Sequence, residues 1–522
     1  MHIVTTYRRV RRAGAVAVLS VIAAGPSLAT AQAFDVRETT IADMHAALRS
    51  RRITCRGIVQ QYLDRIAAND RQGPAINALI TINDRALATA DSLDQAMARG
   101  ATFGALHCAP VIVKDNFETR DLPTSNGALA LARWVPTRDA TQVARVRAAG
   151  AIVLAKANLA EWAFTPYETV GSALPGYTRN PYALDRVTAG SSGGTAAAVA
   201  ANFGAVGLGS DTGNSIRGPS AHQALVGIRS TMGLTSRAGV IPLNAVADIA
   251  GPMTRTVRDA VEMLQVIAGP DAADTVTRHS ANRRETDYRA ALVPDGLRGA
   301  RIGVLRQAFA QPTADAEVLA VFDRAVQDMR RGGATVVDSA NVPAFAEILR
   351  SARGACNRFA FDLATYFATR GEGAPVQSVR DVLANGGYHP TVQARLQAAV
   401  NDTIPPELQP GCAARESMRA RLRAAVTSLM DSLRLDALIY PTWSNPPRLI
   451  GDLNTPHGDN SQQFSPLTGF PAITVPMGYT RGNRLPAGLT LFGRAWSEAR
   501  LITLAFGYEQ ATRHRTPPPL VP

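Results

Sequence analysis

One stretch of small residues, 188–220, constrains the fold more than any other part of the chain. It reads TAGSSGGTAAAVAANFGAVGLGSDTGNSIRGPS, so two turns rich in Gly and Ser enclose an alanine-rich helix and a short strand. Small residues let the backbone approach a ligand closely and adopt positive φ. We therefore expect this segment to build a binding or catalytic site.

Apolar runs that alternate with amphipathic segments surround this stretch and indicate an α/β fold. Helices are expected at 40–70, 85–99, 139–149 and 498–512. Strands are expected at 109–113, 151–155, 301–305, 436–441 and 471–477. No repeat and no flexible linker divides the chain, so 34–522 is expected to be a single large domain. Within it, the mostly helical stretch 343–430 is expected to form a cap-like region.

Residues 1–33 have the pattern of a signal peptide. A basic region ends at Arg12, an apolar stretch spans 13–24, and Ala31-Gln32-Ala33 offers a cleavage site before Phe34. The alternative is an uncleaved anchor, but the apolar part is shorter than the roughly 20 residues a spanning helix needs. We expect a periplasmic or secreted protein, exported by the general or the twin-arginine route, with no stable membrane insertion after cleavage.

The net charge of +13 does not by itself indicate nucleic-acid binding. Four of the arginines lie within residues 8–12, inside the expected signal peptide. The other charges are dispersed, without a run of five like charges or a basic stripe interleaved with aromatic residues. We therefore expect no nucleic-acid partner, and the sequence does not indicate an oligomeric state.

The four cysteines, Cys55, Cys108, Cys356 and Cys412, include no CxxC pair, which argues against a zinc site. Export would place them in an oxidising compartment. A disulfide between Cys356 and Cys412 and a set of four buried thiols are both compatible with the sequence.

Two known site motifs, a phosphate-binding loop and a nucleophile elbow, fit the small-residue stretch poorly. A phosphate-binding loop would need GK[ST] or GxGxxG, and neither occurs there. Gly190–Gly194 matches GxSxG with Ser192 as nucleophile, but that motif needs a buried strand directly before it. Residues 182–189 do not look like such a strand, and none of the later histidines lies in a suggestive context.

Lysine is rare in this chain: only Lys114 and Lys156 occur among 55 basic residues. Lys114 follows the apolar run 111–113, so its amine could enter a desolvated site, and desolvation lowers the pKa of a lysine. Asp115 would oppose this effect only if it pointed the same way, and neighbours on a strand point to opposite faces. The simpler alternative is a lysine that ends a strand and pairs with a carboxylate.

These residues together resemble the amidase signature family of serine hydrolases. AGSSGGT, SDTGNSIRGPS and GIRST in 189–231 are similar to the family's signature, and LAKANLAEWA, GPMTRTVRDA, DALIYPT and GFPAITVPMG extend the similarity. The resemblance covers about residues 36–515. It implies a single α/β/α domain, with a mixed, twisted central sheet covered by helices on both faces.

The resemblance also implies a Ser–cis-Ser–Lys triad. Ser215 would be the nucleophile, and Ser191, after a cis peptide bond from Gly190, would relay its proton to neutral Lys114. Backbone N–H groups of the turn Thr212, Gly213, Asn214 and Ser215 would form the oxyanion hole. No metal or organic cofactor is implied.

The remaining residues of the motifs are expected to support this site. Asp211 and Arg217 would hold the turn by pairing with neighbours, Ser192 would lie outside the triad, and Lys156 would be structural. Asn214 stands where the family has a second Gly; Asn tolerates left-handed backbone, and its side chain would narrow or polarise the site. Ala189 also replaces a Gly, which we treat as a mild change.

The resemblance implies hydrolysis of a carboxylic amide to an acid and ammonia or an amine, through an acyl-enzyme on Ser215. An exported enzyme would act on small-molecule or peptide amides. An ester or carbamate hydrolase with the same triad is the main alternative. Less favoured are a non-catalytic binding protein and an amidotransferase subunit, the latter because transfer RNA is cytoplasmic.

Overall fold

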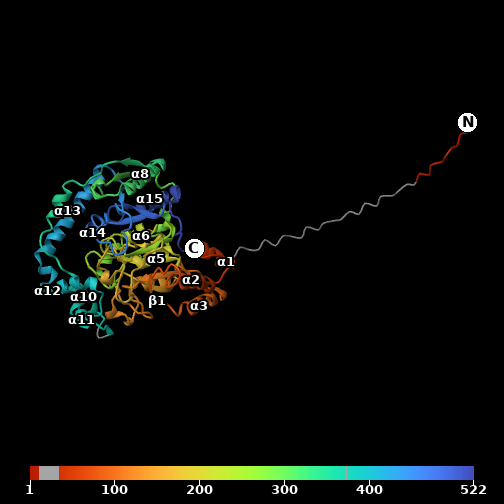
Figure 1. Ribbon diagram of the computed structural model, residues 1–522. Coiled ribbons are helices and arrows are strands. Elements are labelled where there is room, and N and C mark those ends of the chain that lie inside the picture. The colour runs from red at the N-terminus through yellow and green to blue at the C-terminus, as the bar shows by residue number, and fades with distance from the viewer. Residues whose placement is uncertain (11–33, 371–372, 522) are drawn as a thin grey trace. The chain divides into compact units, whose positions relative to one another are not determined.

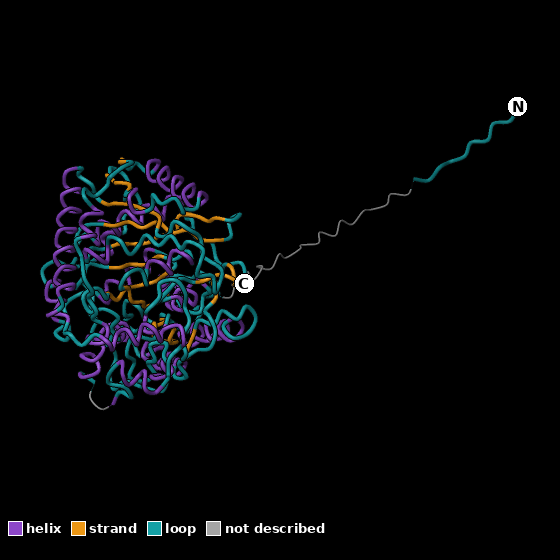
Figure 2. Tube along the Cα trace, turned by 60° about the vertical axis from the view of Figure 1, so that its left-hand side comes forward, coloured by secondary structure: helices purple, strands orange, loops and turns teal. Residues whose placement is uncertain are grey.

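The structure, a computed structural model, describes residues 1–10, 34–370 and 373–521. Eleven strands of the described residues form one sheet, in the order β1-β3-β2-β6-β8-β7-β12-β13-β11-β9-β10. Figure 2 shows the strands in orange, with helices in purple around them. They are β1 (Leu79–Ile82), β2 (Pro110–Lys114), β3 (Ile152–Ala157), β6 (Val206–Asp211), β7 (Val226–Arg229), β8 (Ile249–Thr254), β9 (Arg301–Val304), β10 (Thr335–Val337), β11 (Ala437–Pro441), β12 (Ala472–Thr480) and β13 (Leu485–Phe492).

The sheet is mixed, as expected. Strands β3, β2 and β6 are parallel to one another, and so are β11, β9 and β10. Between these groups the neighbours β6, β8, β7, β12, β13 and β11 pair antiparallel. Strands β2 and β3 are parallel, and each has a lysine at or next to its C-terminal end. The two lysines therefore lie at the same end of these strands.

Helices cover both faces of the sheet. The helices are α1 (Ile41–Arg49), α2 (Cys55–Asn69), α3 (Ala86–Ala98), α4 (Thr141–Ala148), α5 (Gly193–Ala200), α6 (Arg217–His222), α7 (Val257–Ile267), α8 (Ala316–Arg331), α9 (Phe345–Arg350), α10 (Phe359–Ala368), α11 (Val379–Asn385), α12 (Gln393–Asn401), α13 (Pro410–Ser432), α14 (Ser465–Thr468) and α15 (Glu498–Thr512). Helices α5 and α6 form one group, because they contact each other and the middle strands. Helices α7, α8 and α15 form a second group, which also contacts the middle strands and in which α15 contacts both α7 and α8. The two groups make no comparable contacts with each other. The groups therefore lie on opposite faces.

Two predicted elements differ from the structure. The helix expected at 40–70 is two helices, because the chain breaks at 50–54 and the Thr54 side chain accepts a hydrogen bond from Gly57 N to begin α2. Residues 183–187 do form a strand, β5, which pairs with β4 (Arg179–Asn180) in a separate two-stranded sheet. The sequence did not predict this strand because its apolar pattern is interrupted by the charged pair Asp185-Arg186. The strand is not part of the central sheet.

The described part of 343–430 is helical, as expected, and contains α9 to α13. Apolar side chains of α10 and α11, such as Leu363 and Val382, pack with Leu131, Trp134 and Trp162 in one buried cluster. This region is therefore packed against the rest of the domain by a hydrophobic core of its own (Figure 1). From Asp35 onward the chain forms one compact unit.

The structure contains two disulfides, Cys55–Cys108 and Cys356–Cys412. The pairing considered for Cys356 and Cys412 is confirmed, and the alternative of four buried thiols is wrong. The first disulfide joins the start of α2 to the loop before β2, a pair that the sequence pattern did not single out.

The expected signal peptide lies largely outside the described residues, because its apolar stretch and its cleavage site fall within 11–33. Within the described ranges, no helix is both long enough and apolar enough to span a bilayer.

Candidate active site

Lys114 ends the buried strand β2, and its side chain is fully shielded from solvent. Its Nζ lies 2.7 Å from the Oγ of Ser191, 2.9 Å from the Oγ of Ser210 and 3.3 Å from the carbonyl oxygen of Ser210. The apolar residues Val111 and Val113 bury the strand that carries it. The amine is therefore held among hydroxyl groups, and no carboxylate of the described residues pairs with it.

The electrostatic setting of Lys114 favours a neutral amine. Burial lowers the pKa of Lys114 to about 7, although the negative charges of Asp211 and Asp248 partly oppose this shift. The adjacent carboxylate, Asp115, points elsewhere and forms an ion pair with Lys156 at 2.8 Å. The alternation of side chains along a strand thus separates the two lysines into different environments.

Ser191 lies just before helix α5, and the peptide bond between Gly190 and Ser191 is cis. The Gly190 N–H donates to the carbonyl of Pro166 at 2.8 Å. A Cβ on Gly190 would lie 2.6 Å from the carbonyl oxygens of both Thr165 and Glu168, so only glycine fits here. The close approach of these backbones sets where the Ser191 hydroxyl meets Lys114.

Ser215 lies in the 212–215 turn that joins β6 to α6, and it lines a cavity. Its carbonyl accepts a hydrogen bond from Ser192 N at 3.3 Å, which joins the two small-residue turns of the sequence. The Ser215 hydroxyl makes no hydrogen bond to another described residue. Catalytic hydrogen bonds in a free enzyme are often incomplete and tighten when substrate binds.

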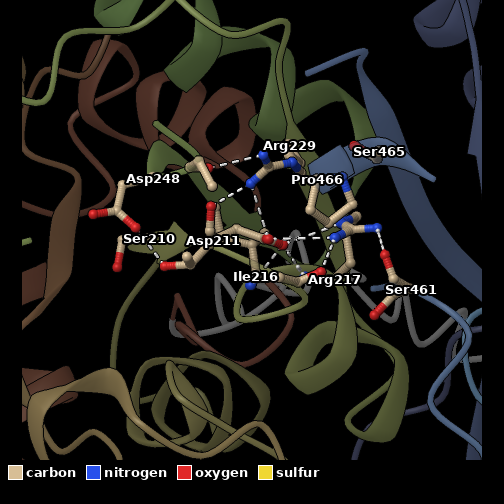
Figure 3. A network of polar contacts seen from close by, with 12 residues as sticks. Ser210, Asp211, Ile216, Arg217, Arg229, Asp248, Ser461, Ser465 and Pro466 are labelled. Carbon is tan, nitrogen blue, oxygen red and sulfur yellow. Dashed lines mark hydrogen bonds and ion pairs between the residues drawn. The ribbon is translucent and has the colours of Figure 1, made fainter. Parts of the chain in front are cut away.

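A buried carboxylate, Asp211, organises this turn (Figure 3). It forms ion pairs with Arg217 at 3.1 Å and with Arg229 at 3.0 Å. Arg217 also donates to the carbonyls of Gly213 at 2.6 Å and Ser461 at 2.8 Å. Burial alone would raise the pKa of Asp211, but the two guanidinium groups lower it to about 2. The pairing role expected for Asp211 and Arg217 is confirmed.

The backbone N–H groups of Gly213, Asn214 and Ser215 donate no hydrogen bond to a described residue, and all three residues line the cavity. These donors are available to a ligand oxygen. Thr212 also lines the cavity, and its hydroxyl donates to the buried carboxylate of Asp248, which holds the start of the turn.

Asn214 occupies the turn differently from our expectation. Its φ is not in the left-handed region, so the tolerance of Asn for that conformation is not used here. The Asn214 amide donates to Asp459 at 3.0 Å, which fixes the side chain against a buried carboxylate. Ala189 instead has φ +61°, so the change from Gly at that position is a strained one rather than a mild one.

Lys156 and Ser192 both make contacts typical of structural residues. Besides its ion pair, Lys156 Nζ donates to the carbonyl of Phe117 at 3.0 Å and to the hydroxyl of Thr124 at 2.9 Å. The Ser192 hydroxyl donates to the carbonyl of Ser210 at 3.2 Å and does not contact Lys114.

Sequence reasoning missed Ser210 as part of the site. Its Oγ accepts from Lys114 and also from the Asn116 amide at 3.0 Å. The only signal was its place directly before Asp211 in the small-residue stretch. Pairing of β2 with β6 brings it to Lys114, and that pairing is not visible along the sequence.

The cavity in front of Ser215 has a volume of about 1120 Å³. Its walls come from the 212–215 turn, from segment 163–167 and from the helical region 343–430, including both Cys356 and Cys412. Phe164, Tyr167 and Phe359 supply apolar surface. This size and mixed lining suit a small organic or peptide ligand.

Comparisons with known proteins identify the family of this chain. A family model described as Amidase matches residues 57–502. An Arabidopsis thaliana protein described as "Probable amidase" is 31% identical, covering 97% of this chain and 96% of its own length. A glutamyl-tRNA(Gln) amidotransferase subunit from Alkaliphilus metalliredigens is 32% identical, covering 91% of this chain and 96% of its own.

Among solved structures, the native peptide amidase from Stenotrophomonas maltophilia superposes with a TM-score of 0.82 at 36% identity. The match covers 92% of this chain and 98% of that enzyme. The family model and the relatives cover nearly all of the domain, including the sheet and the turns that carry Lys114, Ser191 and Ser215. The chain therefore belongs to the amidase signature family, enzymes that act on amides.

Proposed function

We propose that this protein is an exported amidase that cleaves a linear carboxylic amide through an acyl-enzyme on Ser215. The observation that carries the proposal is the buried Lys114 amine, 2.7 Å from the Ser191 hydroxyl, with a pKa lowered to about 7 by burial. A neutral amine at that position can accept a proton at physiological pH, which is what activation of a serine requires.

In the first half of the reaction, the Ser215 Oγ attacks the carbonyl carbon of the amide. The Ser215 proton passes to Ser191, whose own proton passes to Lys114. Collapse of the tetrahedral intermediate breaks the C–N bond, and the leaving nitrogen receives the proton from Lys114 through Ser191. Ammonia or an amine departs, and the acyl group remains on Ser215.

In the second half, a water molecule attacks the acyl carbon and gives its proton to Lys114 by the same relay. As the C–O bond to Ser215 breaks, the proton on Lys114 returns through Ser191 to the Ser215 oxygen. The acid product then leaves, and Ser215, Ser191 and neutral Lys114 are restored. In both halves the N–H groups of Gly213, Asn214 and Ser215, which donate to no described residue and belong to the cavity wall, would stabilise the negative charge that develops on the substrate oxygen. Donors fixed in this way typically supply a factor of about 10²–10³ each in rate.

The Asp211 network has a positioning role in this scheme. Asp211 binds Arg217, which in turn binds the Gly213 carbonyl. This contact fixes the peptide bond between Gly213 and Asn214, so that the Asn214 N–H stays available to the substrate. In this scheme the helical region 343–430 acts as a cap, because its residues line the same cavity as the 212–215 turn.

A peptide or small-molecule amide is the favoured substrate, since the solved peptide amidase is similar over nearly its whole length. The same triad also suits an ester or a carbamate. An amidotransferase subunit is a second candidate, because the glutamyl-tRNA(Gln) amidotransferase relative is 32% identical. The signal-peptide pattern of residues 1–33 disfavours it.

The activity is tested by adding purified protein, without a partner, to peptide C-terminal amides, anilides, short aliphatic amides and p-nitrophenyl esters. We expect release of ammonia or amine by the wild type and loss of that release in Ser215→Ala. Ammonia release that appears only with glutamine and added partner subunits would favour the amidotransferase.

Export is tested separately by expressing the full chain and sequencing the N-terminus of the mature protein. Cleavage should leave Phe34 as the first residue of a periplasmic or secreted product. An uncleaved N-terminus on protein retained in the cytoplasm would contradict export without affecting the proposed chemistry.

A further inference from the structure

The cap side of the cavity carries more positive than negative charge. Its lining residues include four arginines and two glutamates: Arg358, Arg395, Arg415, Arg419, Glu407 and Glu416. Arg358 is paired with the buried carboxylate of Asp362 at 3.1 Å. Of the other three arginines, only Arg419 has a carboxylate of the described residues within 4.0 Å.

Arg419, on helix α13, is well shielded from solvent. Its side chain is 14% exposed, and it donates to the carbonyls of Val246 at 3.0 Å and Pro466 at 3.2 Å. The carboxylate paired with it, Glu416, is 4.0 Å away, 61% exposed, and bound more closely by Arg423 at 2.7 Å. Arg419 therefore places in the cavity wall a positive charge with little nearby negative charge to balance it. Some of its guanidinium N–H groups also remain available to a ligand.

The carbonyls that Arg419 binds lie close to the reacting centre. Val246 is two residues from Asp248, whose carboxylate accepts from Thr212 of the 212–215 turn. Pro466 follows closely after Ser461 in the chain, and the Ser461 carbonyl accepts a hydrogen bond from Arg217. Burial lowers the pKa of Arg229 to about 10, and the charge of Arg419 is among the smaller contributions to that shift. Arg419 is therefore near enough to influence this network electrostatically.

Arg395, on helix α12, adds a second uncompensated charge. Its guanidinium lies 4.4 Å from the centre of the Phe164 ring and donates to the Phe164 carbonyl. Among the described residues, no carboxylate forms an ion pair with Arg395. Burial lowers the pKa of Arg395 and of Arg419, as expected for cations without close counter-ions.

We propose that this cavity selects amides that carry an anionic group, such as a carboxylate, away from the scissile bond, with Arg419 as its main binding residue. A guanidinium can hold a carboxylate by two parallel hydrogen bonds, and the anion supplies the charge that the wall lacks. This inference rests on the proposed amidase function and adds the charge of its substrate.

The test uses p-nitroanilides of one acyl chain that ends in a carboxylate, in a methyl group or in an ammonium group. The wild type should favour the carboxylate over the methyl compound in kcat/KM and disfavour the ammonium compound. Raising the salt concentration should reduce the preference, because salt screens a partly exposed charge. A preference for the methyl or ammonium compound would overturn the inference.

The residue assignment is tested in Arg419→Gln, with Arg421→Gln as control, because Arg421 lies on the same helix and pairs with Glu347 rather than with Glu416. The carboxylate-to-methyl ratio of kcat/KM should fall by about 10- to 100-fold in Arg419→Gln, mainly through KM, as for loss of a hydrogen bond to a charged group. It should be retained in Arg421→Gln. An unchanged ratio in Arg419→Gln would assign the residue a structural role and overturn the proposal.

Arg419 also ties down two backbone carbonyls, so Arg419→Lys is included to keep the charge if the glutamine variant does not fold. It should keep a preference for the carboxylate compound that is weaker than that of the wild type, and loss of all preference would contradict a role based on charge. Hydrolysis of the methyl compound without charge selectivity overturns only this inference. Absence of hydrolysis of all three anilides, together with no release of ammonia or amine from the peptide and aliphatic amides, contradicts the amidase function itself.

Discussion

Replacement of Lys114 by Ala should abolish the rise of kcat/KM with pH that the wild type shows near pH 7. In the proposed mechanism, only neutral Lys114 accepts the proton that Ser191 relays from Ser215. Burial lowers the pKa of Lys114 to about 7. The value of kcat/KM should therefore be low below this pKa, rise tenfold per pH unit as the pH approaches it, and level off above it.

The size of the effect follows from the shift. The pKa falls from 10.5 to about 7, and each unit is a factor of ten in proton affinity. At neutral pH about half of the Lys114 amines are then neutral, whereas an exposed lysine would be neutral in less than about one molecule in a thousand. Burial thus raises the population of competent base by roughly a thousandfold.

The assay is kcat/KM for one amide between pH 5 and 9, because this parameter reports the ionisations of the free enzyme. The substrate must not titrate in that range. The Lys114→Ala variant should retain only residual activity, without the limb near pH 7. The same limb in Lys114→Ala, or a wild-type limb near the pKa of an ordinary lysine, would refute the reasoning.

Three further substitutions test the surrounding structure. Asp211→Asn should lower the free energy of unfolding in urea by about 3–5 kcal/mol, because it leaves buried arginines unpaired, whereas Asp295→Asn at a 77% exposed site should cost under about 1 kcal/mol; equal costs would contradict the network. Lys156→Met should destabilise by a similar ~3–5 kcal/mol but keep the limb near pH 7, and its loss would contradict a structural role. Replacing Cys356 and Cys412 by Ser removes a link across 56 positions and should cost up to about 4 kcal/mol in stability. It should also raise KM, and an unchanged KM would argue against their part in the cavity wall.

The sequence predicted the α/β class and most elements because the apolar runs are long and regular. The strand that carries Lys114 and the final helix are found within a residue or two of their expected bounds. The break after α1 was missed because the apolar pattern continues across it, although the cap at Thr54 needs only a local side-chain hydrogen bond. Strand β5 was missed because its middle residues, 184–186, are not buried and two of them are charged.

The site depended on motifs more than on composition. They brought together Lys114 and Ser191, which are 77 positions apart, and the structure holds them in hydrogen-bond contact. Ser210 and Asp248 could not be found in this way, because strand pairing and a loop contact bring them to the site. The positive charge of the cavity wall formed by region 343–430 likewise comes from the packing of several helices rather than from any one motif.

The central claim is that Ser215 is the nucleophile, and covalent labelling tests it most directly. A fluorophosphonate should form one adduct per chain, and peptide mass spectrometry should locate it on Ser215. The adduct should be absent from Ser215→Ala and should form more slowly in Lys114→Ala. An adduct on Ser192, or no adduct on an enzyme that hydrolyses amides, would contradict the account.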